Sequence, residues 1–374
     1  MSNSIGNNTS DRSRPISNGV RVLQIGTDRT ILDTNSASAA RMREYGEDFG
    51  SLDIIIFSLR RHNLHEVSLS EHVHVYPTNS FSRALYLFAS ILIALKLPRP
   101  DVISAQDPFE TGFIAWIIAV LRGCPLHVQV HTDFLSPEYE RHSFLNWLRV
   151  LIAGFVLRRA KRIRVVSERI KISLEKKYSL RAPMTVLPIF VDVERFRNAS
   201  VEESLAKRFS EFETKLLVVS RLEPEKNVGL AIRAFAKSAL EDSCLIILGE
   251  GSEKGKLQRL SEEKGVSKWV FFEGGESPIK YYKIASLVLA PSLYEGYGMV
   301  IVEALASGVP VLSTDVGIAR EAGAIIAEED DFAKAIRTWF ESGSRAGELK
   351  NYPYKNFDEY AEAYCDDIMS SAFS

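Results

Sequence analysis

Two series of strand-length apolar runs, each interleaved with helical segments, constrain the fold of this chain more than any other feature. The first series lies at 20–25, 52–57, 72–76, 101–105, 126–130 and 163–166. The second lies at 215–219, 244–248, 269–272, 286–290 and 309–313. Helical periodicity occupies most of the intervals, at 36–48, 110–122, 227–240, 253–265, 277–285 and 299–307. Because such alternation is typical of parallel sheets with crossover helices, the sequence predicts two doubly wound α/β domains.

The chain length agrees with two domains, since 374 residues exceed one ordinary core and domains usually span about 100–200 residues. The junction is predicted near 183–198, where Pro183 and Pro188 bracket a stretch without helical period. We predict a disordered lead-in at 1–19, an N-terminal domain at 20–187 and a C-terminal domain at 188–350. The remaining segment, 351–374, could cross back to the first domain. The last segment contains a predicted helix at 356–369. The lead-in is polar and lacks the apolar stretch of a signal peptide.

Overall composition excludes several classes of protein. With 46 basic and 48 acidic side chains the net charge is −2, whereas a dedicated nucleic-acid binder carries excess Lys and Arg. Cys124, Cys244 and Cys365 lie far apart, which predicts neither a zinc site nor a disulfide framework. A reducing, cytoplasmic compartment fits these cysteines best.

One segment departs from this balance. Residues 141–181 carry 12 basic and two acidic side chains, and within them the basic run 158–164 directly follows an apolar stretch at 144–157. Neither this stretch nor the one at 84–97 reaches the roughly 20 apolar residues of a membrane span. Residues 144–164 therefore have two interpretations that stay open: an interfacial anchor on an anionic membrane, or a core helix followed by a solvated turn. The first would make the protein peripheral at the inner face of the membrane.

The densest chemical motif runs from Pro291 to Gly308. Glu295 lies in a Gly-rich turn after an apolar strand, where Gly298 leaves amides available at the start of a helix. Glu303 follows eight residues later, about two helical turns on, and can face the same ligand. Two such carboxylates could each bind sugar hydroxyls while the helix N-terminus faces an anion. Either glutamate alone would more simply be a solvated residue.

A second motif, Val219–Val228, also follows a strand and precedes a helix, which is where α/β sheets bind ligands. Arg221 and Lys226 in this loop suit a diphosphate, although most exposed cations are merely solvated. The loop Leu248-Gly-Glu-Gly251 is not a dinucleotide fingerprint, because Lys254 stands where the third glycine should be.

Together these motifs resemble retaining glycosyltransferases of family 4, over about residues 20–345. The resemblance implies the GT-B fold, in which two Rossmann-like domains with parallel sheets face each other across an interdomain cleft. The resemblance rests on three motifs. The E-x7-E pair is Glu295 and Glu303, and the S-R-x4-K clamp is Ser220, Arg221 and Lys226. The glycine pair is Gly249 and Gly251.

The resemblance also implies roles for these residues. Arg221 and Lys226 would hold the diphosphate of the donor, Glu303 the nucleotide ribose and Glu295 the sugar hydroxyls. The amides of Gly298 and Met299 would lie near the transferred sugar or the diphosphate.

Two further elements follow from the same resemblance. The loop 272–277, with Gly274, would flank the base of the donor. His131 matches the active-site histidine that faces the anomeric carbon; its alternative is a hydrogen-bonded loop residue. The glycine-rich loop that family members carry near the N-terminus is not evident at 28–37.

The predicted function is thus a retaining, metal-independent glycosyltransferase of polysaccharide biosynthesis. It would move a sugar from a UDP or GDP sugar, a substrate and not a cofactor, to a saccharide or lipid-linked acceptor. No Asp-x-Asp metal motif stands in a suitable loop. The alternatives are a nucleotide-sugar epimerase of the same fold and a non-catalytic binding protein.

Overall fold

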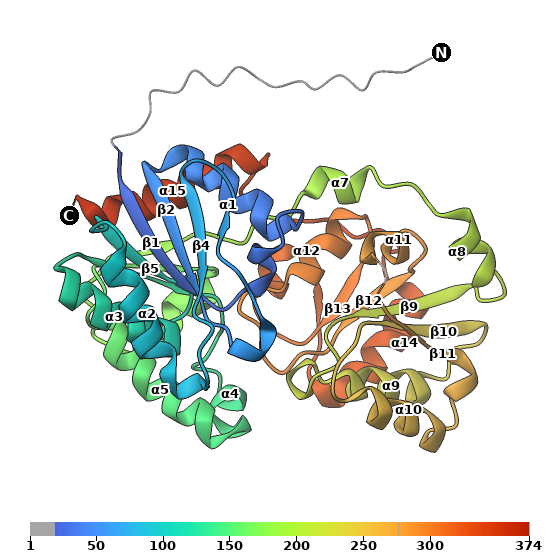
Figure 1. Cartoon of the computed structure of the whole chain (residues 1–374). Helices are drawn as coiled ribbons and strands as arrows, with labels where there is room; N and C mark the ends of the chain where they lie inside the picture. The colour runs from blue at the N-terminus through green and yellow to red at the C-terminus, as the bar shows by residue number, and fades with distance from the viewer. Residues whose placement is uncertain (1–18, 276, 374) are drawn as a thin grey trace, which may run out of the picture. The chain divides into compact units, whose positions relative to one another are not determined.

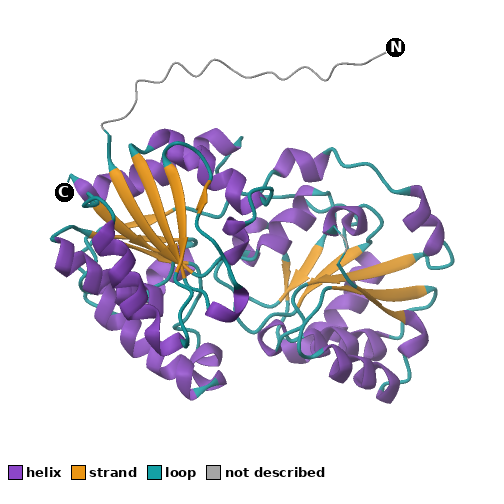
Figure 2. Cartoon of the chain, viewed as in Figure 1, coloured by secondary structure: helices purple, strands orange, loops and turns teal. Residues whose placement is uncertain are grey.

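The computed structural model describes residues 19–275 and 277–373, so the lead-in predicted over 1–19 lies outside the described residues except for Gly19. These residues form two sheets, each flanked by helices (Figures 1 and 2). By their contacts they divide into two compact units. The first holds the described residues up to Val128 together with Arg159–Arg162 and the chain from Ala361 on; the second holds Gln129–Arg158 and Ile163–Tyr360.

The first sheet has eight strands in the order β3-β4-β2-β1-β5-β6-β7-β8. Their bounds are β1 Arg21–Gly26, β2 Ser51–Ile56, β3 Val67–Ser68, β4 Val73–Pro77, β5 Val102–Ala105, β6 Leu126–Val130, β7 Arg162–Val165 and β8 Met184–Val186. β3 runs antiparallel to β4, whereas β1, β2, β4 and β5 pair in parallel. All six predicted strands of the first series are confirmed. β3 and β8 were missed because two or three residues are too few to show a pattern.

The helices that connect these strands are α1 Ala37–Asp48, α2 Tyr86–Lys96, α3 Glu110–Arg122, α4 Pro137–His142, α5 Phe144–Leu157 and α6 Glu168–Lys177. Four of them, α1, α2, α3 and α5, agree with the predicted segments, whereas α4 and α6 were not predicted. Serine caps three of these helices: Ser36, Ser143 and Ser167 each accept a hydrogen bond from an amide in the first turn of α1, α5 and α6. The apolar segments predicted at 84–97 and 144–157 are thus helices of 11 and 14 residues. None of the helices in the described residues combines the length and the hydropathy that a membrane span requires.

The second sheet has six strands, all parallel, in the order β11-β10-β9-β12-β13-β14. Their bounds are β9 Thr214–Val219, β10 Ser243–Leu248, β11 Val270–Glu273, β12 Leu287–Ala290, β13 Val311–Ser313 and β14 Ile325–Ile326. The helices are α7 Val193–Arg197, α8 Glu203–Arg208, α9 Val228–Ser238, α10 Lys254–Glu263, α11 Pro278–Tyr282, α12 Met299–Ala306, α13 Ala319–Ala322 and α14 Phe332–Ser342. The five strands of the second series are confirmed. The stretch 183–198, expected without helical period, contains β8 and the short helix α7.

Successive residues of these strands enter two separate cores. Leu216 and Val218 pack with α9, α10 and α14 on one face of the sheet. Leu217, between them, packs with α11, α12 and α13 on the other face. Because side chains alternate across a strand and both faces are covered, the strands read as continuous apolar runs.

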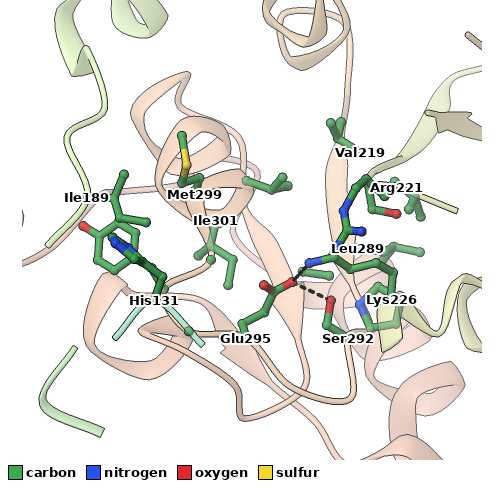
Figure 3. A pocket seen from close by; sticks show the side chains of 18 residues that line it. His131, Ile189, Val219, Arg221, Lys226, Leu289, Ser292, Glu295, Met299 and Ile301 are labelled. Atoms are coloured by element: carbon green, nitrogen blue, oxygen red, sulfur yellow. Dashed lines mark hydrogen bonds and ion pairs between the residues drawn. The ribbon is translucent and has the colours of Figure 1, made fainter. Parts of the chain in front are cut away.

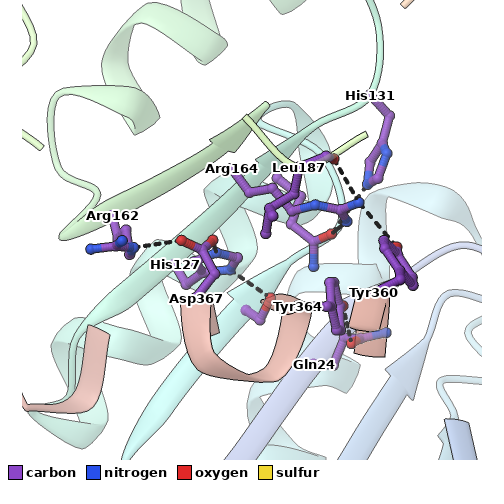
Figure 4. Close-up of polar contacts among 11 residues, drawn as sticks. Gln24, His127, His131, Arg162, Arg164, Leu187, Tyr360, Tyr364 and Asp367 are labelled. Carbon is purple, nitrogen blue, oxygen red and sulfur yellow. Dashed lines mark hydrogen bonds and ion pairs between the residues drawn. The ribbon is translucent and has the colours of Figure 1, made fainter. Parts of the chain in front are cut away.

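The last helix, α15 (Phe357–Ala372), extends the prediction for 356–369 and packs on the first unit (Figure 4). The Tyr364 hydroxyl donates to Gln24 Oε1 on β1 at 3.3 Å. The buried Asp367 carboxylate contacts His127 Nε2 on β6 at 3.0 Å and Arg162 Nε on β7 at 2.5 Å. Since an unpaired buried carboxylate would be costly, these two partners are what permit Asp367 to lie inside.

Candidate functional site

A cavity of about 290 Å³ opens at the carboxyl ends of β9 and β12, within the second unit (Figure 3). Val218, Val219, Leu289 and Ala290 from these strands line it. The structure also brings seven of the predicted site residues to its wall, namely His131, Ser220, Arg221, Lys226, Glu295, Gly298 and Met299. Loops that follow neighbouring parallel strands end at one edge of the sheet, which explains why residues so far apart in sequence meet here.

Lys226 and Glu295 form an ion pair in this cavity. Lys226 ends a 3-10 turn, Pro224–Lys226, and its Nζ lies 2.5 Å from Glu295 Oε1. The Ser292 hydroxyl donates to the same carboxylate oxygen at 2.8 Å. The two charged side chains are only 16 % and 22 % exposed, so water screens the pair weakly. Lys226, predicted on a diphosphate, and Glu295, predicted on sugar hydroxyls, therefore contact each other directly.

Arg221 lines the same cavity but differs from Lys226 in exposure. Its side chain is 69 % exposed, and Nη2 donates to Glu225 Oε1 at 2.8 Å. A contact at this exposure contributes little to stability, which leaves the guanidinium able to reorient toward an anion.

Helix α12 begins at the cavity. Gly298 precedes it with a φ of 97°, a conformation that favours glycine, and Met299 is its first residue. Gly296 is required for a different reason, because a Cβ there would lie 1.8 Å from the carbonyl oxygen of His131. The N-terminus of this eight-residue helix presents backbone amides and the positive end of its dipole to the cavity.

Glu303 is not among the residues that line this cavity. Its Oε2 accepts a hydrogen bond of 2.8 Å from the hydroxyl of Tyr282, which is fully buried. Burial raises the pKa of Glu303 above its ordinary value, and the Tyr282 hydrogen bond acts in the opposite direction. Its assignment to the ribose stays a prediction.

The three other predicted glycines also lie off the cavity wall, and two of them allow a close approach between loops. A Cβ on Gly249 would lie 1.8 Å from the Ser220 carbonyl oxygen, and one on Gly251 would lie 2.3 Å from that of Leu222. A Cβ on Gly274 would lie 2.2 Å from Glu250 Oε1. Gly249 and Gly251 thus permit the loops after β9 and β10 to approach closely, whereas the exposed Glu250 side chain could move away from a Cβ on Gly274. Whether the three glycines contact a donor stays a prediction.

His131 follows β6 and lines the cavity on the side opposite Arg221 and Lys226 (Figure 3). Its Nε2 lies 3.2 Å from Oε1 of the buried Gln129. Ser167 donates to the carbonyl oxygen of Gly296 at 2.9 Å and so fixes the loop beside His131.

Three residues at or near the site were not predicted: Ser292 and Ile189, which line the cavity, and Tyr282, which contacts Glu303. Ser292 does stand inside the Pro291–Gly308 motif. The spacing of three residues between Ser292 and Glu295 could have indicated their contact, because it suits a side-chain hydrogen bond in a turn. The loop after β1 carries no glycine-rich turn: Asp28 Oδ1 accepts from the Thr30 amide and caps the 3-10 turn Arg29–Leu32. Across residues 19–275 and 277–373, no group of three His, Cys, Asp or Glu residues could hold a metal ion.

Two family models match the chain. A glycosyl transferase 4-like domain matches residues 53–189, and the glycosyl transferases group 1 model matches residues 202–356. Together they span most of the chain, with β1 outside both matches.

Curated relatives carry related names. The chain is 26 % identical over 242 residues to the alpha-monoglucosyldiacylglycerol synthase of Streptococcus pneumoniae, covering 60 % of this chain and 54 % of that protein. It is 25 % identical over 251 residues to the UDP-N-acetylglucosamine–peptide N-acetylglucosaminyltransferase GtfA subunit of Streptococcus gordonii, covering 66 % and 48 %. It is 27 % identical over 293 residues to the putative glycosyltransferase EpsF of Bacillus subtilis, covering 75 % of each. The match thus spans about half the length of the first two proteins.

Solved structures share the fold. Anabaena HepE in complex with UDP and glucose matches with a TM-score of 0.68 at 18 % identity, over 93 % of this chain and 95 % of that one. Sucrose-phosphate synthase of Thermosynechococcus elongatus matches with a TM-score of 0.72 at 16 % identity, over 94 % and 96 %. These likenesses confirm the predicted GT-B fold class.

Proposed function

Since this chain belongs to the group 1 glycosyltransferases, we propose that it transfers a sugar from a nucleoside diphosphate sugar to an acceptor hydroxyl, with retention of anomeric configuration. One observation carries the proposal: a single cavity gathers Lys226, Arg221, Glu295 and the N-terminus of α12. Two cations and a helix N-terminus suit a diphosphate, and a carboxylate beside them suits sugar hydroxyls.

The Lys226–Glu295 pair is compatible with donor binding. An ammonium group has three protons, so Lys226 can keep its contact with Glu295 Oε1 while it donates to a phosphate oxygen. Ser292 holds the same Oε1, which directs Oε2 of Glu295 to a sugar hydroxyl. Lys226 would thereby connect the two halves of the donor.

The chemistry that follows is dissociation of the sugar–diphosphate bond. Negative charge grows on the leaving diphosphate, where Lys226, Arg221 and the amides of α12 stabilise it most in the transition state. The acceptor hydroxyl attacks from the face that the diphosphate leaves, and a phosphate oxygen takes its proton. Attack on that face retains the configuration at the anomeric carbon.

A donor panel tests this function. Uridine and guanosine diphosphate sugars would be offered with and without saccharide and lipid-linked acceptors, and released nucleotide measured; HepE, of the same fold, binds UDP, which makes uridine donors the first choice. We expect nucleotide release only in the presence of an acceptor. Conversion of the donor without acceptor would instead support an epimerase, and binding without turnover of any donor would support a non-catalytic protein.

For the acceptor, we propose a lipid-linked saccharide or lipid at the cytoplasmic face of an anionic membrane, with α5 and the exposed Arg158, Arg159 and Lys161 as the contact. Ile163 and Arg164, at the end of the predicted segment 144–164, are buried and take no part in it. Helix α5 buries Val150, Ala153 and Leu157 on one side. Its other side exposes large apolar side chains, each 39–77 % exposed: Phe144, Leu145, Trp147, Leu148 and Leu151. A helix that is apolar on both sides has more apolar surface than its own core needs.

Charge supports an anionic surface as the partner of α5. Arg158, Arg159 and Lys161 follow the helix directly and are exposed, and residues 141–167 contain no Asp or Glu. Each Lys or Arg beside an anionic membrane contributes about 1 kcal/mol, and exposed apolar side chains add to this by entering the interface. Relatives that include alpha-monoglucosyldiacylglycerol synthases agree with a lipid acceptor.

Liposome flotation tests the contact. We expect the protein to float with vesicles that contain anionic lipid and to remain behind with purely zwitterionic ones. Leu148→Ser combined with Leu151→Ser should abolish flotation, whereas Val201→Ser, at a residue of similar exposure outside α5, should not change it. Flotation that ignores lipid charge, or that survives the α5 substitutions, would contradict the proposal.

A further inference from the structure

A buried arginine lies behind the cavity at His131. Arg164, on β7, is 2 % exposed and is among the largest fully enclosed side chains of the described residues. In the sequence it interrupts the apolar run Ile163-Arg-Val-Val166, where a solvent-facing side chain would be the ordinary expectation. Burial of such a charge is costly unless hydrogen bonds compensate, so its partners identify what it does.

Three oxygens accept hydrogen bonds from Arg164 (Figure 4). Nη1 donates to Gln129 Oε1 at 2.7 Å, and Nη2 donates to the Leu187 carbonyl and the Tyr360 hydroxyl, both at 3.1 Å. Leu187 follows β8, and Tyr360 belongs to α15. Elements far apart in sequence thus hold the guanidinium in one orientation.

The contact with Gln129 fixes the orientation of its side-chain amide. A guanidinium can only donate, so the Gln129 atom 2.7 Å from Arg164 has to be the oxygen. The same oxygen lies 3.2 Å from His131 Nε2. An oxygen only accepts, and therefore Nε2 of His131 is the nitrogen that carries a proton.

We propose that Arg164 is a positioning residue for His131: through Gln129 it selects the imidazole tautomer protonated on Nε2. A neutral histidine has one protonated nitrogen, and selecting Nε2 makes Nδ1 the acceptor. The ring therefore presents one defined hydrogen-bonding pattern to whatever occupies the cavity. Without Arg164 the Gln129 amide could rotate, offer its NH₂ group to Nε2 and reverse that pattern.

The expected effect of Arg164 on turnover rests on the proposed function, whereas its effect on the His131 tautomer does not. The tautomer can be measured without substrate, by nitrogen-15 NMR of labelled histidine at alkaline pH, where an imidazole is neutral. The chain has seven histidines, and the His131→Ala variant assigns the signal. We expect the wild-type protein to show the Nε2-protonated form, and Arg164→Met and Gln129→Met each to give a mixture of tautomers.

Gln129→Met serves as the second variant in case Arg164→Met does not fold, because it removes the relay while the arginine stays. An Nδ1-protonated His131 in the wild-type protein would overturn the proposal. An unchanged tautomer in a folded variant would overturn it equally.

Kinetics supply the independent test of coupling. If Arg164 acts through His131, Arg164→Met should lower kcat no more than His131→Ala does, and should cause no further loss in the double variant. Multiplying losses would mean that Arg164 acts elsewhere and would overturn the proposal. If the tautomer shifts as expected but no sugar transfer is found, the proposed function fails while the positioning role stands.

Discussion

The helices that cover the two sheets differ in what they expose. On the second sheet, α14 buries Phe332, Ile336 and Trp339 and exposes Lys334 and Arg337. On the first sheet, α2 and α5 also bury one side, yet their exposed sides carry Phe88, Leu92, Phe144 and other large apolar residues. One buried apolar side and one exposed polar side, as in α14, are sufficient for a helix to pack on a sheet. The comparison teaches that α2 and α5 carry apolar surface that packing does not explain, whereas the second sheet carries its chemistry in loops.

The largest contrast should appear in stability. Trp339 is buried, and its Nε1 donates to the Ser344 carbonyl at 3.0 Å, so Trp339→Ala should lower the free energy of unfolding by about 3–5 kcal/mol. Leu92 on α2 is 62 % exposed, and Leu92→Ala should change stability by less than about 0.5 kcal/mol. Urea unfolding of both variants measures the difference. A large loss with Leu92→Ala would show that the exposed side of α2 does belong to a core.

Substitution of Lys226 should produce the next largest effect, confined to activity. We expect Lys226→Ala to lower kcat/KM for sugar transfer about 100-fold or more, because the variant loses charge stabilisation of the leaving diphosphate. Its thermal unfolding should stay close to wild type, since Ser292 keeps its hydrogen bond to the Glu295 carboxylate in the variant. Near-normal transfer by this variant would remove Lys226 from the proposed machinery.

Arg221 should matter less than Lys226. Its side chain is largely exposed and pairs with Glu225, so water screens its interaction with a phosphate more strongly. We expect Arg221→Ala to lower kcat/KM by about tenfold, and the loss should grow as ionic strength falls. Equal losses for both variants at all salt concentrations would contradict the ranking by burial.

The smallest effect concerns Glu303 and pH. Burial raises the pKa of this carboxyl in the folded protein, so its contribution to stability is present below its ordinary value of 4.5 and is lost as pH rises through the folded value. Glutamine does not ionise. The Tm of Glu303→Gln should therefore match wild type near pH 4 and exceed it by at most a few °C near neutrality. A Tm of Glu303→Gln that falls below that of the wild-type protein as pH rises would contradict a raised pKa of Glu303.

Much of the fold and part of the site could be predicted from the sequence. Continuous apolar runs indicated parallel strands because both sheet faces are covered, and short β3, β8 and β14 lacked enough residues for a pattern. Helix α14 was missed although its buried residues follow helical spacing. The cavity was predictable where loop residues directly follow β9 and β12.

The contacts inside the site were not predictable. Lys226 and Glu295 are 69 residues apart, and nothing in either motif indicates that they pair. The burial of Arg164 was not predictable either, because sequence spacing does not show that Gln129, Leu187 and Tyr360 converge on it. Such long-range polar contacts depend on where strands meet in the sheet, which only the folded structure supplies.

Direct binding of nucleoside diphosphates tests the central claim, that the cavity at β9 and β12 is a donor site built around Lys226. Calorimetry would measure UDP and GDP against the wild-type protein and Lys226→Ala. We predict that at least one of them binds the wild-type protein and that its affinity falls tenfold or more in the variant, a loss of about 1.4 kcal/mol or more. Failure of both to bind, or equal affinity for the two proteins, would contradict the account.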